Sequence, residues 1–377
     1  MRFLARERAA LDSLLPGLDK ELAGRPLGEL ERPGNPGVKA FREAGGAGLL
    51  VPAAHGGKGA DALAAVRVQR AIGSRSPSLA VATTMHHFSL ASLVALSETG
   101  NGFEWMLLTG VVNGNLLLAS GFAEGQPNGS ILRPTMSARV TEAGVVMNGA
   151  KRPCSLARSM DLLTASVMVP REDGRGEQLA VVLIPAESPG LTVSPFWGSF
   201  ALAGAESDQV TVTDVLVPHD LVVRTEVPEG EALDDIQTTG FVWFELLMTA
   251  SYLGAASALV ERLVGNERVP DLERVRLVGE LEAAVAAVEN VARRTGAALC
   301  GQELLVDSLH VRYAAQDTLA RVVPRAVELL GGLNFMSSDD IGYLAAAVHG
   351  LGLHPPARAK MAAPLARYLA GHSLEIV

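Results

Sequence analysis

Few of the titratable and nucleophilic residues occur in sequence patterns that are typical of acid–base or nucleophilic catalysis. His86 and His87 are adjacent in "TTMHHFSLAS", so their side chains would diverge on a helix, whereas a helical metal site needs ligands four residues apart. The segment "GHSLE" around His372 lacks the second glycine of a nucleophile elbow. The two cysteines, Cys154 and Cys300, are too few for a disulfide framework or a cysteine-rich metal site. We therefore predict no metal centre.

One carboxylate differs from the others in its surroundings. Glu245 lies in "GFVWFELLMTAS", where most neighbours are apolar. Burial among such residues disfavours the charged form of a carboxylate and raises its pKa toward neutrality. A general base needs a pKa matched in this way, so Glu245 is a candidate for proton abstraction. The alternative is a simple ion pair at the start of a helix.

The overall composition excludes several classes of protein. Of 377 residues, 48% are hydrophobic and 19% charged, so the chain can bury a large core. The net charge is −9 and no long basic run appears, which argues against nucleic acid as a partner. The N-terminal "MRFLARERAALDSLL" is not typical of a secretory signal, and "LLMTASYLGAASALV" is too short to span a bilayer comfortably. With so few cysteines, we expect a cytoplasmic protein without a membrane span.

Three lobes with different periodicity follow one another along the chain. Residues 1–116 show helical spacing of apolar residues, interrupted by breaks such as "RPGNPG". Residues 117–228 contain β-branched runs and the hairpin pattern "ARVTEAGVVMNGAKR", with turns expected at Glu-Ala-Gly and Asn-Gly. Residues 229–377 return to long helical patterns. The sequence predicts an α+β fold with an N-terminal helical domain, a middle antiparallel β domain and a C-terminal four-helix-type bundle.

Six short segments, in order along nearly the whole chain, carry a resemblance to a known family. They are "LLVPAAHGGKGAD", "ASGFAEGQPNGS", "VVMNGAKRPCSLARSMDLL", "QVTVTDVLVP", "AVELLGGLNF" and "RYLAGHS". No segment is specific alone, but together and in this order they resemble the acyl-CoA dehydrogenase family. The second segment is similar to the family's Thr-Glu-Pro segment, which lies against a flavin, and the last to its Glu-Gly-Thr tail.

The resemblance implies FAD as cofactor and α,β-dehydrogenation of an acyl thioester on CoA or an acyl carrier protein. In the family a carboxylate takes the α-proton, the flavin takes a hydride, and the electrons pass to an electron-transfer flavoprotein or to oxygen. No Gly-x-Gly-x-x-Gly follows a strand here, which agrees with a flavin site outside the Rossmann fold. Because a neighbouring subunit completes the family's flavin site, the resemblance also implies a homodimer or homotetramer.

The resemblance implies a set of flavin-binding positions, with several departures from the family pattern. Ala123 replaces a threonine, Pro153 replaces the tryptophan that covers the flavin, and Glu328 replaces a glutamine. The usual Arg-x-x-Phe-Gly motif is absent, and in "NERVPDLERVR" either Arg268 or Arg274 would be its substitute. The implied cofactor-binding residues are Phe122, Ala123, Ser130, Ser155, Arg268, Glu328, Gly331 and Gly332.

The largest departure concerns the catalytic base. Ala370 stands where the family's C-terminal tail has its glutamate. Some members carry the base on a helix of the third lobe, and this position falls close to Glu245. His372 takes the place of the family's threonine and is a second candidate acid or base. Glu375 and Glu124 are weaker candidates.

Three functions remain open at this point. The first is dehydrogenation of an acyl thioester in a specialised-metabolite pathway. The second is a flavin monooxygenase on the same scaffold, which would lack the glutamate and hydroxylate nitrogen or carbon. The third is a non-redox protein that has lost its flavin.

Overall fold

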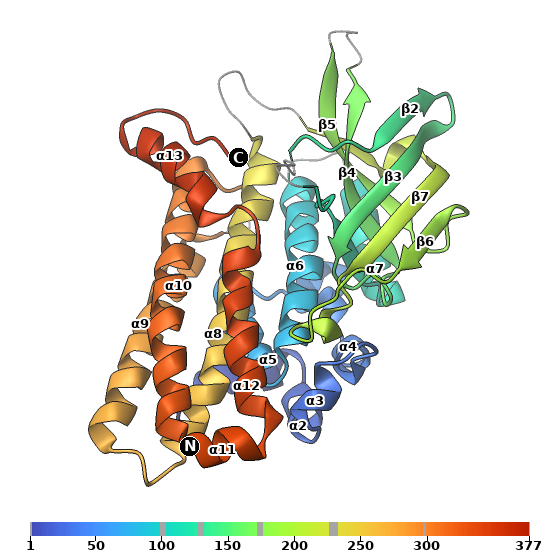
Figure 1. Ribbon diagram of the computed structural model, residues 1–377. Helices are drawn as coiled ribbons and strands as arrows, with labels where there is room; N and C mark the ends of the chain where they lie inside the picture. Colours follow the sequence, from blue (N-terminus) through green and yellow to red (C-terminus); the bar gives the residue numbers. More distant parts are fainter. Residues whose placement is uncertain are drawn as a thin grey trace.

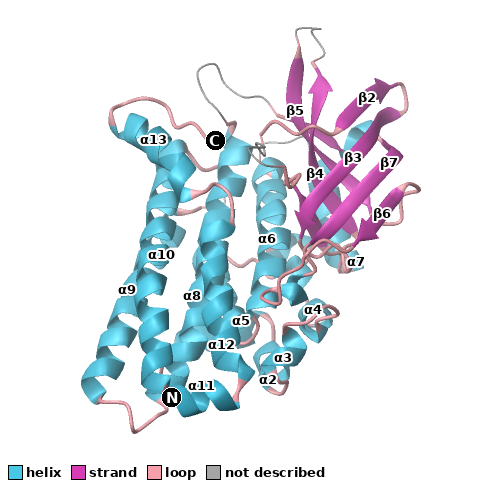
Figure 2. Cartoon of the chain, viewed as in Figure 1, coloured by secondary structure: helices cyan, strands magenta, loops and turns pink. Residues whose placement is uncertain are grey.

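Helices form both ends of the chain and strands form its middle (Figure 1). The computed structural model describes residues 2–98, 103–126, 132–171, 176–225, 233–296 and 299–376. Helices and strands separate clearly in space, with the strands gathered on one side of a long helical body (Figure 2). The predicted fold class is confirmed. The division at residues 116 and 228 stays a prediction, although the first strand begins at Leu118 and the last ends at Arg224.

The first lobe consists of short helices around one long apolar helix, α6. Ser76 caps α6, since its hydroxyl accepts the Leu79 N–H at 3.1 Å, and Pro77 occupies the first turn. Apolar side chains surround α6 on all faces, which explains its burial. The helices are α1 (Ala5–Leu14), α2 (Leu18–Ala23), α3 (Leu27–Leu30), α4 (Pro36–Glu43), α5 (Ala62–Gly73), α6 (Pro77–Ser97) and α7 (Phe103–Gly114), with 3-10 turns η1 (Gly46–Gly48) and η2 (Ala53–His55).

The strands form two four-stranded sheets, ordered β1-β4-β5-β8 and β2-β3-β7-β6. Their bounds are β1 (Leu118–Gly121), β2 (Ser137–Thr141), β3 (Gly144–Cys154), β4 (Leu162–Pro170), β5 (Glu177–Pro185), β6 (Leu191–Ser194), β7 (Asp208–Val217) and β8 (Val222–Arg224). The pair β1–β4 is parallel, whereas we expected antiparallel pairing throughout. A parallel pair needs a long crossover. Here the β2–β3 hairpin, which belongs to the other sheet, provides it in place of a helix.

The predicted hairpin forms, but only one of its two expected turns exists. Thr141 pairs with Gly144 across the Glu-Ala turn. Asn148 and Gly149 lie inside β3, where the register with β7 shifts between Met147 and Gly149. Gly149 has φ 146°, so it supplies the irregular backbone of a bulge.

The C-terminal lobe is built around α8, a buried helix of 30 residues. A close glycine contact sets its distance to α5: a Cβ added at Gly254 would lie 2.4 Å from the Arg70 carbonyl oxygen. The remaining helices are α9 (Asp271–Arg294), α10 (Gln302–Leu330), α11 (Gly332–Ser337), α12 (Asp339–Val348) and α13 (Arg358–Leu369), with a 3-10 turn η5 (His349–Leu353); α8 itself spans Asp235–Val264. Both α6 and α8 are long and apolar enough to cross a membrane, but their most apolar windows are 83% and 100% buried inside the protein, as expected for core helices.

Candidate functional site

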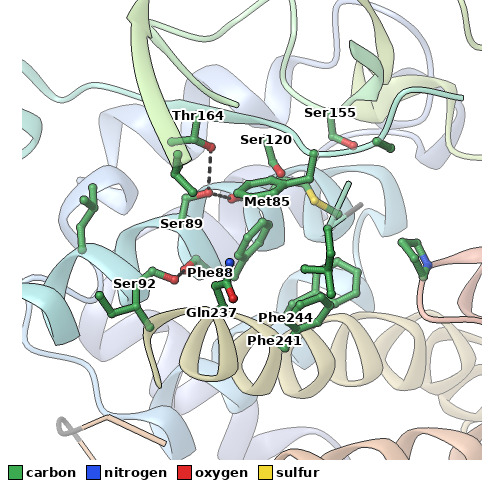
Figure 3. Close-up of a pocket in the computed structure, with 18 of the residues that line it drawn as sticks. Met85, Phe88, Ser89, Ser92, Ser120, Ser155, Thr164, Gln237, Phe241 and Phe244 are labelled. Atoms are coloured by element: carbon green, nitrogen blue, oxygen red, sulfur yellow. Dashed lines mark hydrogen bonds between the residues drawn. The ribbon is translucent and has the colours of Figure 1, made fainter. Parts of the chain in front are cut away.

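A cavity of about 210 Å³ lies where α6 and α8 meet the strands. Figure 3 shows Ser120, Ser155 and Thr164 on the side of the strands, and Gln237, Phe241 and Phe244 on α8 across from them. The side chains from α8 recur at three- and four-residue intervals, so one stripe of the helix faces the cavity. The lining is mostly apolar.

Three phenylalanines form the apolar centre of the lining. The Phe88 ring lies between those of Phe122 and Phe244, with centroid distances of 5.8 and 5.6 Å. Their arrangement is tilted or edge-to-face, as aromatic pairs prefer. Gly240 lets α6 approach α8 beside them, because a Cβ there would lie 2.7 Å from the Ser92 Oγ.

The side of the cavity formed by the strands carries hydroxyl groups. The Ser155 and Ser207 Oγ atoms lie 2.9 Å apart, so one hydroxyl donates to the other. Thr164 donates to the Ala119 carbonyl at 3.0 Å and lies 3.2 Å from the Ser89 Oγ. This wall therefore places hydroxyl groups that can form hydrogen bonds beside the apolar centre of the cavity.

The titratable groups of the lining are few. Among the described residues around the cavity, Arg224 and His354 are titratable and no aspartate or glutamate is present. The His354 Nε2 lies 2.8 Å from the Tyr252 hydroxyl. Burial, with the nearby Arg312 guanidinium, lowers the pKa of His354 to about 3, so its imidazole is neutral at physiological pH.

The turn that carries His354 is held by a buried ion pair. Arg312 on α10 donates to both carboxylate oxygens of Glu245 at 2.9 and 2.8 Å, and both side chains are fully buried. Arg312 also donates to the carbonyl oxygens of Leu351, His354 and Pro355. Burial raises the pKa of the Glu245 carboxyl, and Arg312 opposes that shift. Glu245 thus fixes the turn beside the cavity but does not line the cavity itself.

The structure brings only part of the predicted flavin site together. Phe122, Ala123 and Ser155 line the cavity, and so does Pro153, which follows a cis peptide bond. Ser130 lies outside the described residues.

The other predicted flavin-binding residues lie at the far end of the bundle. Arg268 follows the end of α8, about 30 Å along that helix from Phe244. The Glu328 carboxylate pairs with Arg325 at 2.8 Å, and Gly331 and Gly332 join α10 to α11. Among the described residues of a single chain they form no common site with the cavity, so their predicted role in flavin binding would need a second copy of the chain.

The predicted C-terminal acid–base residue lies away from the cavity. His372 is exposed after α13, where its backbone N–H donates to the Arg367 carbonyl. Glu375 pairs with Arg367. Glu124 accepts from Lys151 at 2.8 Å and from Thr135, which is a structural role. Catalysis by Glu245 or His372 remains a prediction, and neither side chain borders the cavity.

Sequence reasoning missed His354 and Gln237, both of which line the cavity. The segment "GLHPPAR" lies between two helical patterns and outside the six segments that resemble the family. A signal for Gln237 was present in the form of Asp234 three residues earlier, the spacing of a capping box. That spacing predicts a helix start and gives no indication of a cavity.

Known proteins resemble this chain in sequence and in fold. No family model matches the chain. It is 47% identical to isobutylamine N-hydroxylase of Streptomyces viridifaciens over 379 residues, which cover all of both chains. TdsC from Paenibacillus sp. A11-2, solved with FMN and indole, matches 98% of both chains with a TM-score of 0.82 and 18% identity. The prolyl acyl carrier protein oxidase AnaB matches 97% of this chain and 99% of its own with a TM-score of 0.79 and 16% identity. The chain belongs to the acyl-CoA dehydrogenase-like flavoprotein superfamily.

Proposed function

We propose that this protein is a flavin-dependent monooxygenase that hydroxylates the nitrogen of a small primary amine. The observation that carries the proposal is the absence of any carboxylate among the described residues that line the apolar cavity. Nitrogen can attack an electrophilic oxygen only through its lone pair, which an ammonium ion lacks. An apolar cavity lowers the pKa of a bound ammonium and so favours the neutral amine. The full-length similarity to isobutylamine N-hydroxylase supports the same reaction.

The residues present fit a flavin. Its ring needs a flat space with hydrogen-bonding groups along one edge, and the cavity has an apolar centre beside the Ser120 and Ser155 hydroxyls. Phe122 and Ala123 border the same wall. We infer that these residues hold the ring edge. A reduced flavin bound there would supply two electrons to O₂, so that one oxygen atom goes to the amine nitrogen and the other leaves as water. These residues would contact the flavin ring, which FAD and FMN share, so they do not distinguish the two cofactors.

The remaining lining residues orient the amine and keep water out. Phe88 and Phe244 close the apolar side, where they exclude water that would intercept a reactive oxygen species. The neutral His354 adds no positive charge. Because Tyr252 contacts its Nε2, proton exchange with the substrate would use Nδ1.

Dehydrogenation of an acyl thioester on CoA or a carrier protein is the second candidate. Its support is the shared superfamily. It needs a base beside the substrate α-carbon, but Glu245 does not line the cavity and its carboxylate is engaged by Arg312. His354 is the other titratable group able to accept a proton there, but its low pKa makes it a weak base.

Product analysis separates the two reactions. The purified protein receives reduced FMN or FAD, oxygen and isobutylamine, and the hydroxylamine is quantified with ¹⁸O₂ as label. We expect labelled hydroxylamine that depends on the protein. An enoyl product from butanoyl-CoA without any hydroxylamine would overturn the proposal in favour of dehydrogenation.

A matched pair of variants tests the requirement for a neutral amine. Ser92→Asp places a carboxylate in the cavity, whereas Ser92→Asn places a neutral group of the same shape there. The aspartate should hold the substrate as an ammonium ion, lower kcat/KM by about 10-fold or more relative to asparagine, and move the pH optimum upward. Equal activity and equal pH profiles of the two variants would contradict this part of the mechanism.

A further inference from the structure

One wall of the cavity is formed by the loop that joins β6 to β7, residues 195–207. Three residues of this loop line the cavity: Trp197, Leu202 and Ser207. The Ser207 Oγ lies 2.9 Å from the Oγ of Ser155, at the edge where we place the flavin ring. The position of the 195–207 loop therefore decides whether this hydroxyl edge is complete.

Leu202 has a backbone conformation that leucine rarely adopts. Its φ is 62° and its ψ is 20°, in the left-handed region, where a bulky side chain is strained. The 3-10 turn η3 (Ala203–Ala205) follows directly. A strained backbone of this kind persists only where surrounding groups hold it. The contacts of Leu202 and η3 therefore keep the loop in place.

Tyr343 and Glu31 hold this part of the loop. The Leu202 N–H donates to the Tyr343 hydroxyl oxygen at 2.9 Å, and that hydroxyl donates to the Glu31 carboxylate. The Gly204 N–H donates to the Glu31 main-chain carbonyl at 3.0 Å. A Cβ added at Gly204 would lie 2.8 Å from the Leu30 carbonyl oxygen, so glycine permits this close approach. Glu31 thus contacts the turn directly and, through Tyr343, holds the residue before it.

The buried Glu31 carboxylate orients the Tyr343 hydroxyl. Ser76 donates to its Oε1 at 2.7 Å and Ser78 to its Oε2 at 2.5 Å, which fix the carboxylate as an acceptor. Because the Tyr343 O–H donates to Glu31, its oxygen lone pairs remain to accept the Leu202 N–H. Glu31 follows α3 and Tyr343 lies on α12, two helices that are in contact although they are far apart in sequence (Figure 1).

We propose that Tyr343, oriented by Glu31, is a positioning residue for flavin binding, because it holds the loop whose Ser207 completes the hydroxyl edge of the cavity. This inference deepens the proposed function and rests on it where the flavin is concerned. Neither Tyr343 nor Glu31 lines the cavity, so both act through the loop. Loss of the Tyr343 hydroxyl removes the acceptor of the Leu202 N–H, so the strained backbone can relax and move Trp197 with it.

Tyr343→Phe tests the proposal, because it removes the hydroxyl and keeps the ring. Ser78→Ala is the matched control, since it takes a hydroxyl from the same Glu31 oxygen but leaves the Leu202 N–H on Tyr343. Incorporated 5-fluorotryptophan gives a ¹⁹F resonance for each of the three tryptophans, and Trp197→Phe assigns that of Trp197. Titration of the flavin-free protein with FMN measures the affinity for flavin.

We expect Tyr343→Phe to shift or broaden the Trp197 resonance and to weaken FMN binding by about 3- to 10-fold, the effect of one lost hydrogen bond. Ser78→Ala should change neither the resonance nor the affinity. An unchanged Trp197 resonance in Tyr343→Phe, or equal changes in both variants, would overturn the proposal. A shifted resonance with unchanged FMN affinity would also overturn it, since the loop would then have no role in flavin binding. A wild type that binds FMN but forms no hydroxylamine would refute the proposed function alone.

Discussion

At the scale of single residues, the two adjacent histidines of α6 have different surroundings. The Leu118 N–H donates to the His86 Nδ1 at 3.1 Å, so the Nε2 of the neutral ring carries the proton and donates to the Ala47 carbonyl at 3.0 Å. His87 is equally buried, and neither of its ring nitrogens has a hydrogen-bond partner within the described residues. Burial lowers the pKa of His86 to about 4 and that of His87 well below its usual value.

These histidines should make the protein acid-sensitive. The unfolded chain binds their protons near pH 6.5, whereas the folded chain keeps His86 neutral to about pH 4, and burial also holds the pKa of His87 well below its usual value. The unfolded state therefore binds more protons in this window, and stability falls as the pH drops from 6.5 toward 4. At pH 5.5 His86 should cost about 1 kcal/mol of unfolding free energy relative to pH 7, and His87 should act in the same direction. Denaturant unfolding of wild type and His87→Leu measures this. The variant should lose about half of the pH dependence, and an unchanged dependence would show that His87 does not cause it.

At the scale of elements, the Glu245–Arg312 pair joins α8, α10 and the turn before α13. Glu245→Gln removes one partner of a buried ion pair and should lower the unfolding free energy by about 3–5 kcal/mol. Activity should fall with it, because the turn with His354 loses its support. Thermal unfolding and turnover are measured together, and Glu245→Leu with Arg312→Met should regain part of the stability. A variant with wild-type stability and no turnover would instead favour Glu245 as the catalytic base.

The contact between α5 and α8 gives a second test at this scale. Gly254→Ala pushes a methyl group against the Arg70 carbonyl and should destabilise the protein by about 1–3 kcal/mol. Gly279 on α9 faces open space, so Gly279→Ala should be neutral or stabilising by up to about 1 kcal/mol. Unfolding midpoints of the two variants provide the comparison. Equal effects would mean that the two helices can separate without cost.

At the scale of the whole molecule, one end of the bundle exposes a group of large apolar side chains. Leu333, Phe335 and Met336 on α11 are 76%, 50% and 77% exposed, and Leu272 and Val275 at the start of α9 are 79% and 71% exposed. The Arg325–Glu273 ion pair of 3.0 Å joins the end of α10 to the same start of α9. Arg268 and Gly331 lie beside these segments in sequence.

We expect this face to be an interface in a dimer or tetramer, because exposed apolar groups of this extent are rare on monomers. Leu333→Asp with Met336→Glu should dissociate the oligomer and weaken flavin binding, since a neighbour would no longer reach the cavity. Light scattering and flavin titration measure the two effects. Leu369→Glu, an equally exposed change on α13, is the control. A wild-type monomer at micromolar concentration would refute the prediction.

Only those residues of the candidate site that lie in family-like sequence segments could be predicted from the sequence. Phe122, Ala123 and Ser155 belong to segments that resemble the family, and they line the cavity. His372 was placed by aligning the tail with Glu-Gly-Thr, whereas the turn at His354 reaches the cavity instead. The residues between α12 and α13 have no periodicity, so sequence spacing gave no information on where the turn folds.

The sequence by itself determined the order of lobes, because apolar periodicity and turn residues act between near neighbours along the chain. It also determined that α8 is buried, since most faces of that helix are apolar. The tertiary structure alone decided the parallel pairing of β1 with β4, the ion pair between Glu245 and Arg312, and the meeting of Gln237 with a cavity. Those outcomes depend on residues far apart in sequence, and 67 positions separate Glu245 from Arg312. Only the packing of helices and strands against each other brings such groups within hydrogen-bonding distance.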